Sequence, residues 1–361
     1  MKNSTIRSLV LLLLGILFSL VSARAELKVG VIIPTSGFAA EYGRAIINGI
    51  ELAQGEQTKE TSQKLHYIFE DASYDPKLAI QAFHKLVNVD QVDLLYVWGV
   101  SFCKALAPLA ESHKIPMIGQ CVDYESARGK NFVIRFMNPS DEYARVMSKH
   151  LELSGFNKIA LIVSENAYLE ELSKSYELFL GNKLIKTERV AINEKDFRSS
   201  LMRLRDSGTE ALGLMLNSGQ YALVAKQLAE INWAPQLFAN NYLESSSEVA
   251  AASPGIYGTL IPSSSLSPEF IHKYLARFKT DGQLGFAVLA YEFARMLASI
   301  ESKLASHSTP EDRILDLKQV APVFNSAAGP YRYVQSPDYG GYFQFQLKIK
   351  QILPMNFREI D

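Results

Sequence analysis

This 361-residue chain has no clustered histidines, no nucleotide-binding glycine loop and only one long apolar run. Each of these features argues against a class of protein. The six histidines stand apart from one another and from the two cysteines, so no group of them has the spacing of a metal site. Neither a Walker loop nor a dinucleotide-binding glycine fingerprint occurs. We therefore expect neither a metal nor a cofactor.

The one long apolar run is at the N-terminus, over residues 9–21. It follows two basic residues and ends at the small-x-small sequence of residues 23–25, which is the layout of a secretory signal peptide. We expect residues 1–25 to be removed by cleavage before Glu26, and the mature protein to be periplasmic. An uncleaved membrane anchor is the alternative, but a spanning helix needs about 20 apolar residues, more than this run holds.

A strong charge of either sign is also absent. Without residues 1–25, which hold three basic residues and no acid, the chain keeps 34 basic and 38 acidic side chains. Such a balance does not provide the basic surface that nucleic acid or an anionic membrane requires of a partner. The remaining 336 residues exceed one typical hydrophobic core, so two domains are expected.

Strand and helix patterns alternate through the first part of the mature chain. The expected buried strands are residues 27–33, 65–69, 94–97, 115–118 and 132–136. Amphipathic segments at residues 42–54, 76–89 and 105–112 separate them. Alternation of this kind predicts parallel strands with helices on both faces of the sheet.

The same alternation restarts after residues 138–141, and the C-terminal part mixes helices with aromatic strands. This predicts an α/β fold of two lobes, each an open, mainly parallel sheet flanked by helices, with a ligand cleft between them. The C-terminal part is too short for a third domain and completes the other two. We place lobe 1 at residues 26–138 plus 265–334, and lobe 2 at residues 139–264 plus 335–361.

Polar and aromatic residues follow the expected strands, at the edges where ligands bind in such folds. In lobe 1 Ser101 stands where a helix follows directly, so its hydroxyl and the free amides of the helix start can bind an anion. In lobe 2 the strand ends bring Tyr168, Asn217 and Asn241. Tyr and Asn suit recognition because they offer hydrogen bonds without reactive groups.

The segment Gly99-Val100-Ser101-Phe102-Cys103 begins like the nucleophile elbow of a serine hydrolase. Cys103 replaces the second glycine, which a strained strand-to-helix turn needs for close packing. A hydrolase with Ser101 as nucleophile is therefore the weakest of the functional hypotheses, and we expect the protein not to be an enzyme.

Cys103 and Cys121 are the only cysteines, and each follows the end of one of two consecutive strands. Neighbouring parallel strands lie about 5 Å apart, which can bring the two Cα atoms within disulfide range. We predict a disulfide between them. The alternative is two buried, reduced cysteines whose side chains point to opposite faces.

Several segments together resemble the leucine/isoleucine/valine-binding proteins of branched-chain amino-acid ABC transporters, a family of periplasmic binding proteins of type I fold. KVGVIIPTSGFAAEYGRAIINGIELA resembles the family's opening strand, turn and helix. FEDASYDPKLAIQAFHKLVN resembles its second strand, Asp-Pro turn and helix. APLAESHKIPMIG, RFMNPSD and EKDFRSSLMRLRDSG follow in order, so the resemblance covers essentially the whole mature chain.

The resemblance implies a role for several residues of lobe 1. Ser101 falls at the loop that binds the ligand carboxylate in the family, and Cys121 where a small residue offers its carbonyl. Asp123 falls where a Thr is usual. Tyr42 and Phe286 match aromatic walls of the cleft.

Lobe 2 departs from the family pattern. Tyr168 matches the Tyr of a Tyr-Gly pair, but Leu169 replaces the Gly. Asn241 stands where the family has the Glu that pairs with the ligand's ammonium group, and a neutral amide cannot supply that charge. Either Asp123 takes over this role and the ligand is an amino acid, or the ligand is an amide, a urea-like or another small polar compound.

The family implies an extracytoplasmic receptor that captures a small molecule and delivers it to the membrane permease of an ABC importer. A sensor module of the same fold, acting on a membrane kinase or another regulator, is the alternative. We expect the protein to be a monomer in either case.

Overall fold

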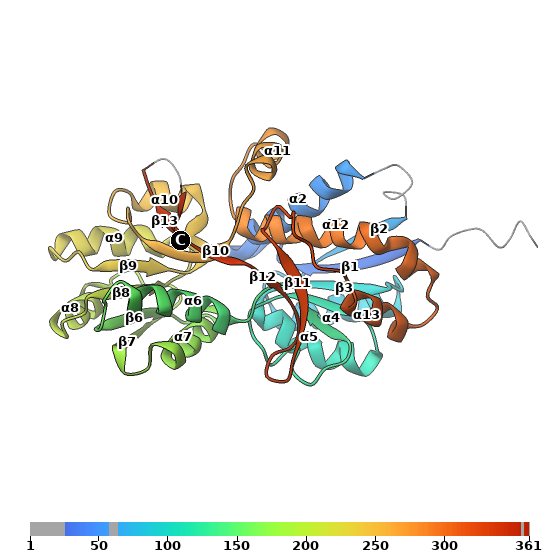
Figure 1. Cartoon of the computed structure of the whole chain (residues 1–361), viewed down its shortest axis with the longest axis horizontal. Coiled ribbons are helices and arrows are strands. Elements are labelled where there is room, and N and C mark those ends of the chain that lie inside the picture. Colours follow the sequence, from blue (N-terminus) through green and yellow to red (C-terminus); the bar gives the residue numbers. More distant parts are fainter. Residues whose placement is uncertain (1–25, 58–63, 355–356, 361) are drawn as a thin grey trace, which may run out of the picture.

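The computed structural model describes residues 26–57, 64–354 and 357–360, which form two lobes side by side (Figure 1). Each lobe is built on one seven-stranded sheet. The expected signal peptide is outside the described residues. Within them, none of the helices combines the length and the apolarity that a membrane-spanning helix needs.

Lobe 1 contains the sheet β11-β12-β5-β4-β3-β1-β2, in which all neighbours are parallel except β11 and β12. Its strands are β1 (Leu27–Ile33), β2 (Leu65–Asp71), β3 (Leu94–Trp98), β4 (Met117–Gln120), β5 (Val133–Arg135), β11 (Tyr331–Ser336) and β12 (Gly340–Phe345). Its helices are η1 (Gly37–Ala39), α2 (Ala40–Glu56), α4 (Pro76–Asn88), α5 (Val100–His113), α11 (Pro268–Phe278), α12 (Leu284–Ser306) and α13 (Pro310–Lys318). Helices α2 and α12 pack together on one side of the sheet, and α4 and α5 on the other (Figure 1).

Lobe 2 contains the sheet β14-β13-β10-β9-β8-β6-β7, parallel from β10 to β7 and antiparallel at the two C-terminal strands. Its strands are β6 (Ile159–Ser164), β7 (Leu184–Val190), β8 (Ala211–Met215), β9 (Gln236–Ala239), β10 (Leu260–Ser264), β13 (Leu347–Ile352) and β14 (Phe357–Ile360). Its helices are α6 (Ser140–Leu153), α7 (Ala167–Leu180), η2 (Gly181–Lys183), α8 (Arg198–Asp206), α9 (Gln220–Glu230), η3 (Asn241–Glu244) and α10 (Ser246–Ala252). The expected α/β architecture of two mainly parallel sheets flanked by helices is confirmed.

Local sequence explains why these elements form where they do. Strand β1 pairs with parallel strands on both sides and is buried almost throughout, as its apolar sequence LKVGVII requires. Helix α4 begins at Pro76, and the Asp75 side chain accepts a hydrogen bond from the amide of Lys77. Asn166 caps the start of α7 in the same way, through the amide of Tyr168. These caps fix helix starts at the strand ends that face the cleft.

The last crossing between the lobes is later than the sequence suggested. The division at residues 334/335 is wrong for this segment, because β11 and β12 are both strands of the lobe 1 sheet. A short turn joins them, so their antiparallel pairing keeps them in one sheet. The rings of Tyr331, Phe343 and Phe345 also pack around Phe136 of lobe 1. The chain crosses to lobe 2 at Gln346, between β12 and β13.

Candidate functional site

The cleft between the lobes holds two adjoining cavities at the carboxyl ends of the parallel strands. The inner cavity has a volume of about 20 Å³ and the outer one about 340 Å³. Tyr74, Trp98 and Tyr242 line both. The inner cavity is further lined by Gly99, Val100, Gln120, Cys121, Val122, Met137, Tyr168 and Phe286. The outer cavity is further lined by Phe38, Ala39, Tyr42, Asn166, Ile192, Asn193, Asn217 and Ser218.

Aromatic rings from both lobes meet in the cleft. Tyr42 of lobe 1 stacks on Trp98 with ring centroids 5.1 Å apart, and it contacts Tyr242 of lobe 2 at 4.9 Å. Phe286 packs edge-on against both Tyr42 and Trp98. The hydroxyl of Tyr42 also forms a 2.7 Å hydrogen bond with the Ser218 hydroxyl, which joins the lobes directly. The two lobes are therefore in contact at the cleft.

Charged side chains are missing from the walls of both cavities, as far as the described residues go. The nearby acids are engaged elsewhere. Both oxygens of the buried Glu244 are bonded, one to Lys350 at 2.7 Å and the other to Ser263 at 2.7 Å. Glu41 accepts hydrogen bonds from Gln283 at 2.9 Å and from Ser218 at 3.3 Å. No carboxylate of the described chain lines the cavities to pair with a ligand ammonium group, and no histidine is there to act as a base.

The start of α5 provides the polar end of the inner cavity. Gly99 precedes this helix with a positive φ of 102°, and a Cβ there would lie 2.8 Å from the Tyr74 ring, so glycine is required. The first hydrogen bond at the helix start runs from the Cys103 amide to the Gly99 carbonyl, at 2.9 Å. The amides of Val100 to Phe102 therefore have no partner within the helix, and the positive end of the helix dipole lies at the cavity.

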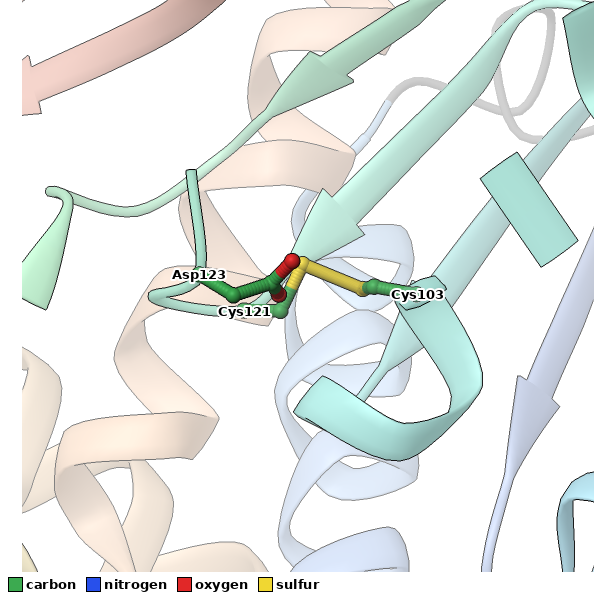
Figure 2. A group of neighbouring side chains, drawn as sticks. All are labelled: Cys103, Cys121 and Asp123. Carbon is green, nitrogen blue, oxygen red and sulfur yellow. A yellow bond between two sulfur atoms is a disulfide. The ribbon is translucent and has the colours of Figure 1, made fainter. Parts of the chain in front are cut away.

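A disulfide joins Cys103, in the first turn of α5, to Cys121, directly after β4 (Figure 2). Their Cα atoms are 6.6 Å apart and both side chains are buried. Cys121 lines the inner cavity, so the bond fixes two walls of that cavity to one another. Because their sulfur atoms are bonded together, Cys103 and Cys121 do not offer the thiolates of a metal site.

Asp123 is beside the disulfide but does not line either cavity (Figure 2). Its side chain accepts hydrogen bonds from the amide and the hydroxyl of Ser126, and its Oδ1 atom is buried without a partner. Burial raises the pKa of Asp123, against the opposing effects of Ser126 and of the Arg135 guanidinium. The side chain is thus turned into lobe 1, because the loop after β4 uses it to cap its own turn.

The other proposed site residues fall into two groups. Tyr42, Tyr168, Asn217 and Phe286 line the cavities with Cys121. Ser101 and Asn241 do not. Asn241 is behind Tyr168, whose hydroxyl donates to it at 2.6 Å.

Ser101 is in the first turn of α5, beside Tyr74. Burial raises the pKa of Tyr74 to about 12, although a hydrogen bond with Ser101 lowers it.

Trp98, Tyr74 and Tyr242 line both cavities but were not among the predicted site residues. Trp98 is the last residue of β3, so its place in a buried strand concealed that it reaches the cleft. Tyr74 is in the turn before α4, and Tyr242 directly follows Asn241. All three stand at or just beyond strand ends, which is the signal that could have identified them.

The family model described as periplasmic binding protein matches residues 26–339. The chain belongs to this family. It is similar to the Leu/Ile/Val-binding protein homolog 1 of Brucella suis, with 25% identity over 346 residues that cover 90% of this chain and 91% of the relative. The periplasmic binding proteins of type I fold that bind branched-chain amino acids are thus its relatives, as the resemblance implied.

Two solved binding proteins show the same fold. A leucine-binding protein from Thermotoga maritima has a TM-score of 0.80 and 17% identity, covering 93% of this chain and 98% of its own. An ABC transporter solute-binding protein from Rhodopseudomonas palustris, in complex with benzoate, has a TM-score of 0.80 and 19% identity, covering 93% of this chain and 96% of its own.

Proposed function

We propose that this protein is the extracytoplasmic solute-binding component of an ABC importer, and that it captures a small carboxylic acid with a flat, apolar body. The observation that carries the proposal is the cleft itself: aromatic walls from both lobes, no charged side chain among the described residues that line it, and the positive end of α5 at the inner cavity.

The ligand carboxylate has a partner in such a cleft, whereas an ammonium group has none. The unpartnered amides at the start of α5 favour an anion. An ammonium group buried among Trp98, Tyr242 and Phe286 would lose its hydration without gaining a carboxylate, which is costly. This favours an acid over an α-amino acid, and it leaves Asp123 without the role of ammonium partner. The Rhodopseudomonas palustris protein, with benzoate bound, is a relative in fold whose ligand is of this class.

Binding requires the lobes to part and close again. At about 20 Å³ the inner cavity has room for roughly one water molecule, so an acid enters only when the walls contributed by the two lobes move apart. Closure around the ligand then restores the contacts between the lobes. A ligand shifts this equilibrium by its preference for the closed form, which is the form we propose the permease receives.

Matched ligands test the proposal by calorimetry on the purified protein. Leucine and 4-methylpentanoate differ only in the amino group, and benzoate and benzamide differ only in the carboxylate. We expect 4-methylpentanoate to bind more tightly than leucine, and benzoate more tightly than benzamide. The proposed ligand class is wrong if both orders are reversed.

A tryptophan variant tests the place of binding. Trp98→Ala should weaken binding of benzoate by about 10- to 100-fold, because a large aromatic wall is lost. Trp233→Ala is the matched control, since Trp233 is the other tryptophan of the chain and lines neither cavity of the cleft. Equal losses in the two variants would place the binding elsewhere.

Periplasmic export is the second part of the proposal. The N-terminal apolar run and the small-x-small sequence before Glu26 support removal of residues 1–25. The intact mass of the protein recovered from the periplasm should correspond to a chain that begins at Glu26. A full-length mass would contradict this.

A further inference from the structure

One salt bridge joins the two lobes among those formed between described residues. The Nζ atom of Lys104, on α5 of lobe 1, is 2.6 Å from Oε1 of Glu171, on α7 of lobe 2. Lys104 also lies 3.4 Å from Glu125 of its own lobe, and Lys174 lies 3.4 Å from the same Oε1 of Glu171 within lobe 2. Lys104 and Lys174 thus share one carboxylate, but only the bond to Lys104 depends on how the lobes sit.

The bridge is one helical turn behind the cleft. Lys104 follows Ser101, in the first turn of α5, by three residues, and Glu171 follows the cavity residue Tyr168 by three, so each charge lies one turn further along its helix. Helices α5 and α7 contact one another across the junction between the lobes. The bridge can therefore form only when the start of α5 and Tyr168 are brought together.

Partial burial makes this bridge stronger than an ordinary surface pair. The Glu171 side chain is 6% exposed and that of Lys104 is 34% exposed. Solvent screening is reduced at such a site, whereas fully exposed pairs contribute little. Once the lobes part, Glu171 keeps Lys174 but loses Lys104, so the energy of the bridge is gained only in the closed form.

We propose that Lys104 and Glu171 form a latch that favours the closed form and raises ligand affinity without touching the ligand. The proposal rests on the interlobe ligand site proposed above. An interaction present in one of two states shifts the equilibrium by its own free energy. The apparent affinity for any ligand of the closed form falls in proportion to the fraction of molecules that are closed.

Small-angle scattering of the ligand-free protein tests the latch without reference to any ligand. Lys104→Ala should have a larger radius of gyration than the wild type, because more molecules are open. Lys174→Ala is the matched control and should keep the wild-type radius, since it removes a positive charge from the same carboxylate within one lobe. Equal radii for Lys104→Ala and the wild type would overturn the proposal.

Calorimetry with benzoate tests the effect on affinity. Lys104→Ala should raise the dissociation constant about 3- to 10-fold, and Lys174→Ala by less than about 2-fold. Lys104→Met, which keeps most of the side-chain packing without the charge, should show the same loss as Lys104→Ala, which a role of Lys104 in packing alone would not produce. A loss in Lys174→Ala as large as in Lys104→Ala would overturn the latch.

The two proposals fail in different ways. If benzoate does not bind the wild type, the proposed ligand class is wrong, while the scattering comparison still decides the latch. If benzoate binds all variants equally and their radii agree, the latch is wrong and the ligand class stands.

Discussion

The two lobes have sheets of corresponding strand order, yet they hold their cleft loops by different means. In lobe 1 a covalent bond from Cys103 to Cys121 joins the first turn of α5 to the loop after β4. In lobe 2 the ends of the neighbouring strands β6 and β8 are held together by amide hydrogen bonds. Asn217 accepts from Asn166 at 2.9 Å and donates to the Ser164 hydroxyl at 2.8 Å.

This difference assigns different tasks to the two halves of the cleft. A disulfide fixes the distance between two walls, whereas each hydrogen bond contributes only about 1 kcal/mol and can be exchanged for water. Lobe 1 therefore offers a preformed surface beside the positive end of α5, and lobe 2 an adjustable one. We expect a ligand to bind lobe 1 first and lobe 2 on closure.

Removing the disulfide should have the largest effect on this comparison. The cysteines are 18 residues apart, and closing a loop of that size restricts the unfolded chain by about 3 kcal/mol. Cys103→Ala with Cys121→Ala should lower the free energy of unfolding by that amount and weaken ligand binding. Chemical denaturation and calorimetry measure the two effects.

Reductant provides the control for the disulfide. Dithiothreitol added in denaturant should lower the stability of the wild type but not that of the double alanine variant. A thiol assay on the denatured, unreduced protein should find no free cysteine, in agreement with the bonded pair. Two free thiols would contradict the bond. Equal denaturation midpoints for the wild type and the double alanine variant would remove the contrast between the lobes.

Breaking the amide network of lobe 2 should have a smaller effect. Asn217→Ala removes the hydrogen bonds to Asn166 and Ser164 and part of the outer cavity wall, which should cost about 1–2 kcal/mol of stability. Asn157→Ala is the matched control, because Asn157 is exposed in the same lobe and its side chain bonds only locally, to the Gly155 carbonyl. Denaturation midpoints of the wild type, Asn217→Ala and Asn157→Ala measure these stabilities. Equal losses of stability in both variants would contradict a role for the amide network.

The sequence was sufficient to predict the architecture, because buried strands and amphipathic helices leave periodic patterns. It also indicated that ligand residues follow strand ends, where Tyr42 and Asn217 do line the cleft. The direction of a side chain was less predictable. Asp123 is at a strand end, but its carboxylate bonds to Ser126 instead of facing the cleft.

Pairing between distant residues was beyond the reach of sequence patterns. Nothing local relates Lys104 to Glu171, which is 67 positions away. The membership of β12 in the lobe 1 sheet depends likewise on its pairing with β5, about 200 positions earlier. Local signals fix elements, and long-range packing decides which elements meet.

The smallest expected effect concerns a charged contact of lobe 1, at the carboxyl ends of β1 and β2. Asp71, at the end of β2, accepts hydrogen bonds from the amides of Thr35 and Ser73, at 2.8 and 2.9 Å, and from the Ser36 hydroxyl. It thereby ties the turn after β1 to the turn after β2, which carry Phe38 and Tyr74 towards the cleft. In lobe 2 the equivalent strand ends are joined by a neutral backbone bond, from the Glu165 amide to the Val190 carbonyl at 3.0 Å.

This contact makes lobe 1 sensitive to acid at a defined pH. Burial raises the pKa of Asp71, but the hydrogen bonds from Ser36, Ser73 and Thr35 outweigh it and lower the pKa from 3.8 to about 2. Because the folded pKa is below the unfolded one, the stabilisation is fully present above about pH 4 and is lost as the pH falls towards 2. Asp71→Asn should be less stable than the wild type at pH 7, and the difference should shrink between pH 4 and 2. Denaturant titrations of both proteins at several pH values measure it, and a constant difference across that range would show that the charge of Asp71 does not hold the two turns together.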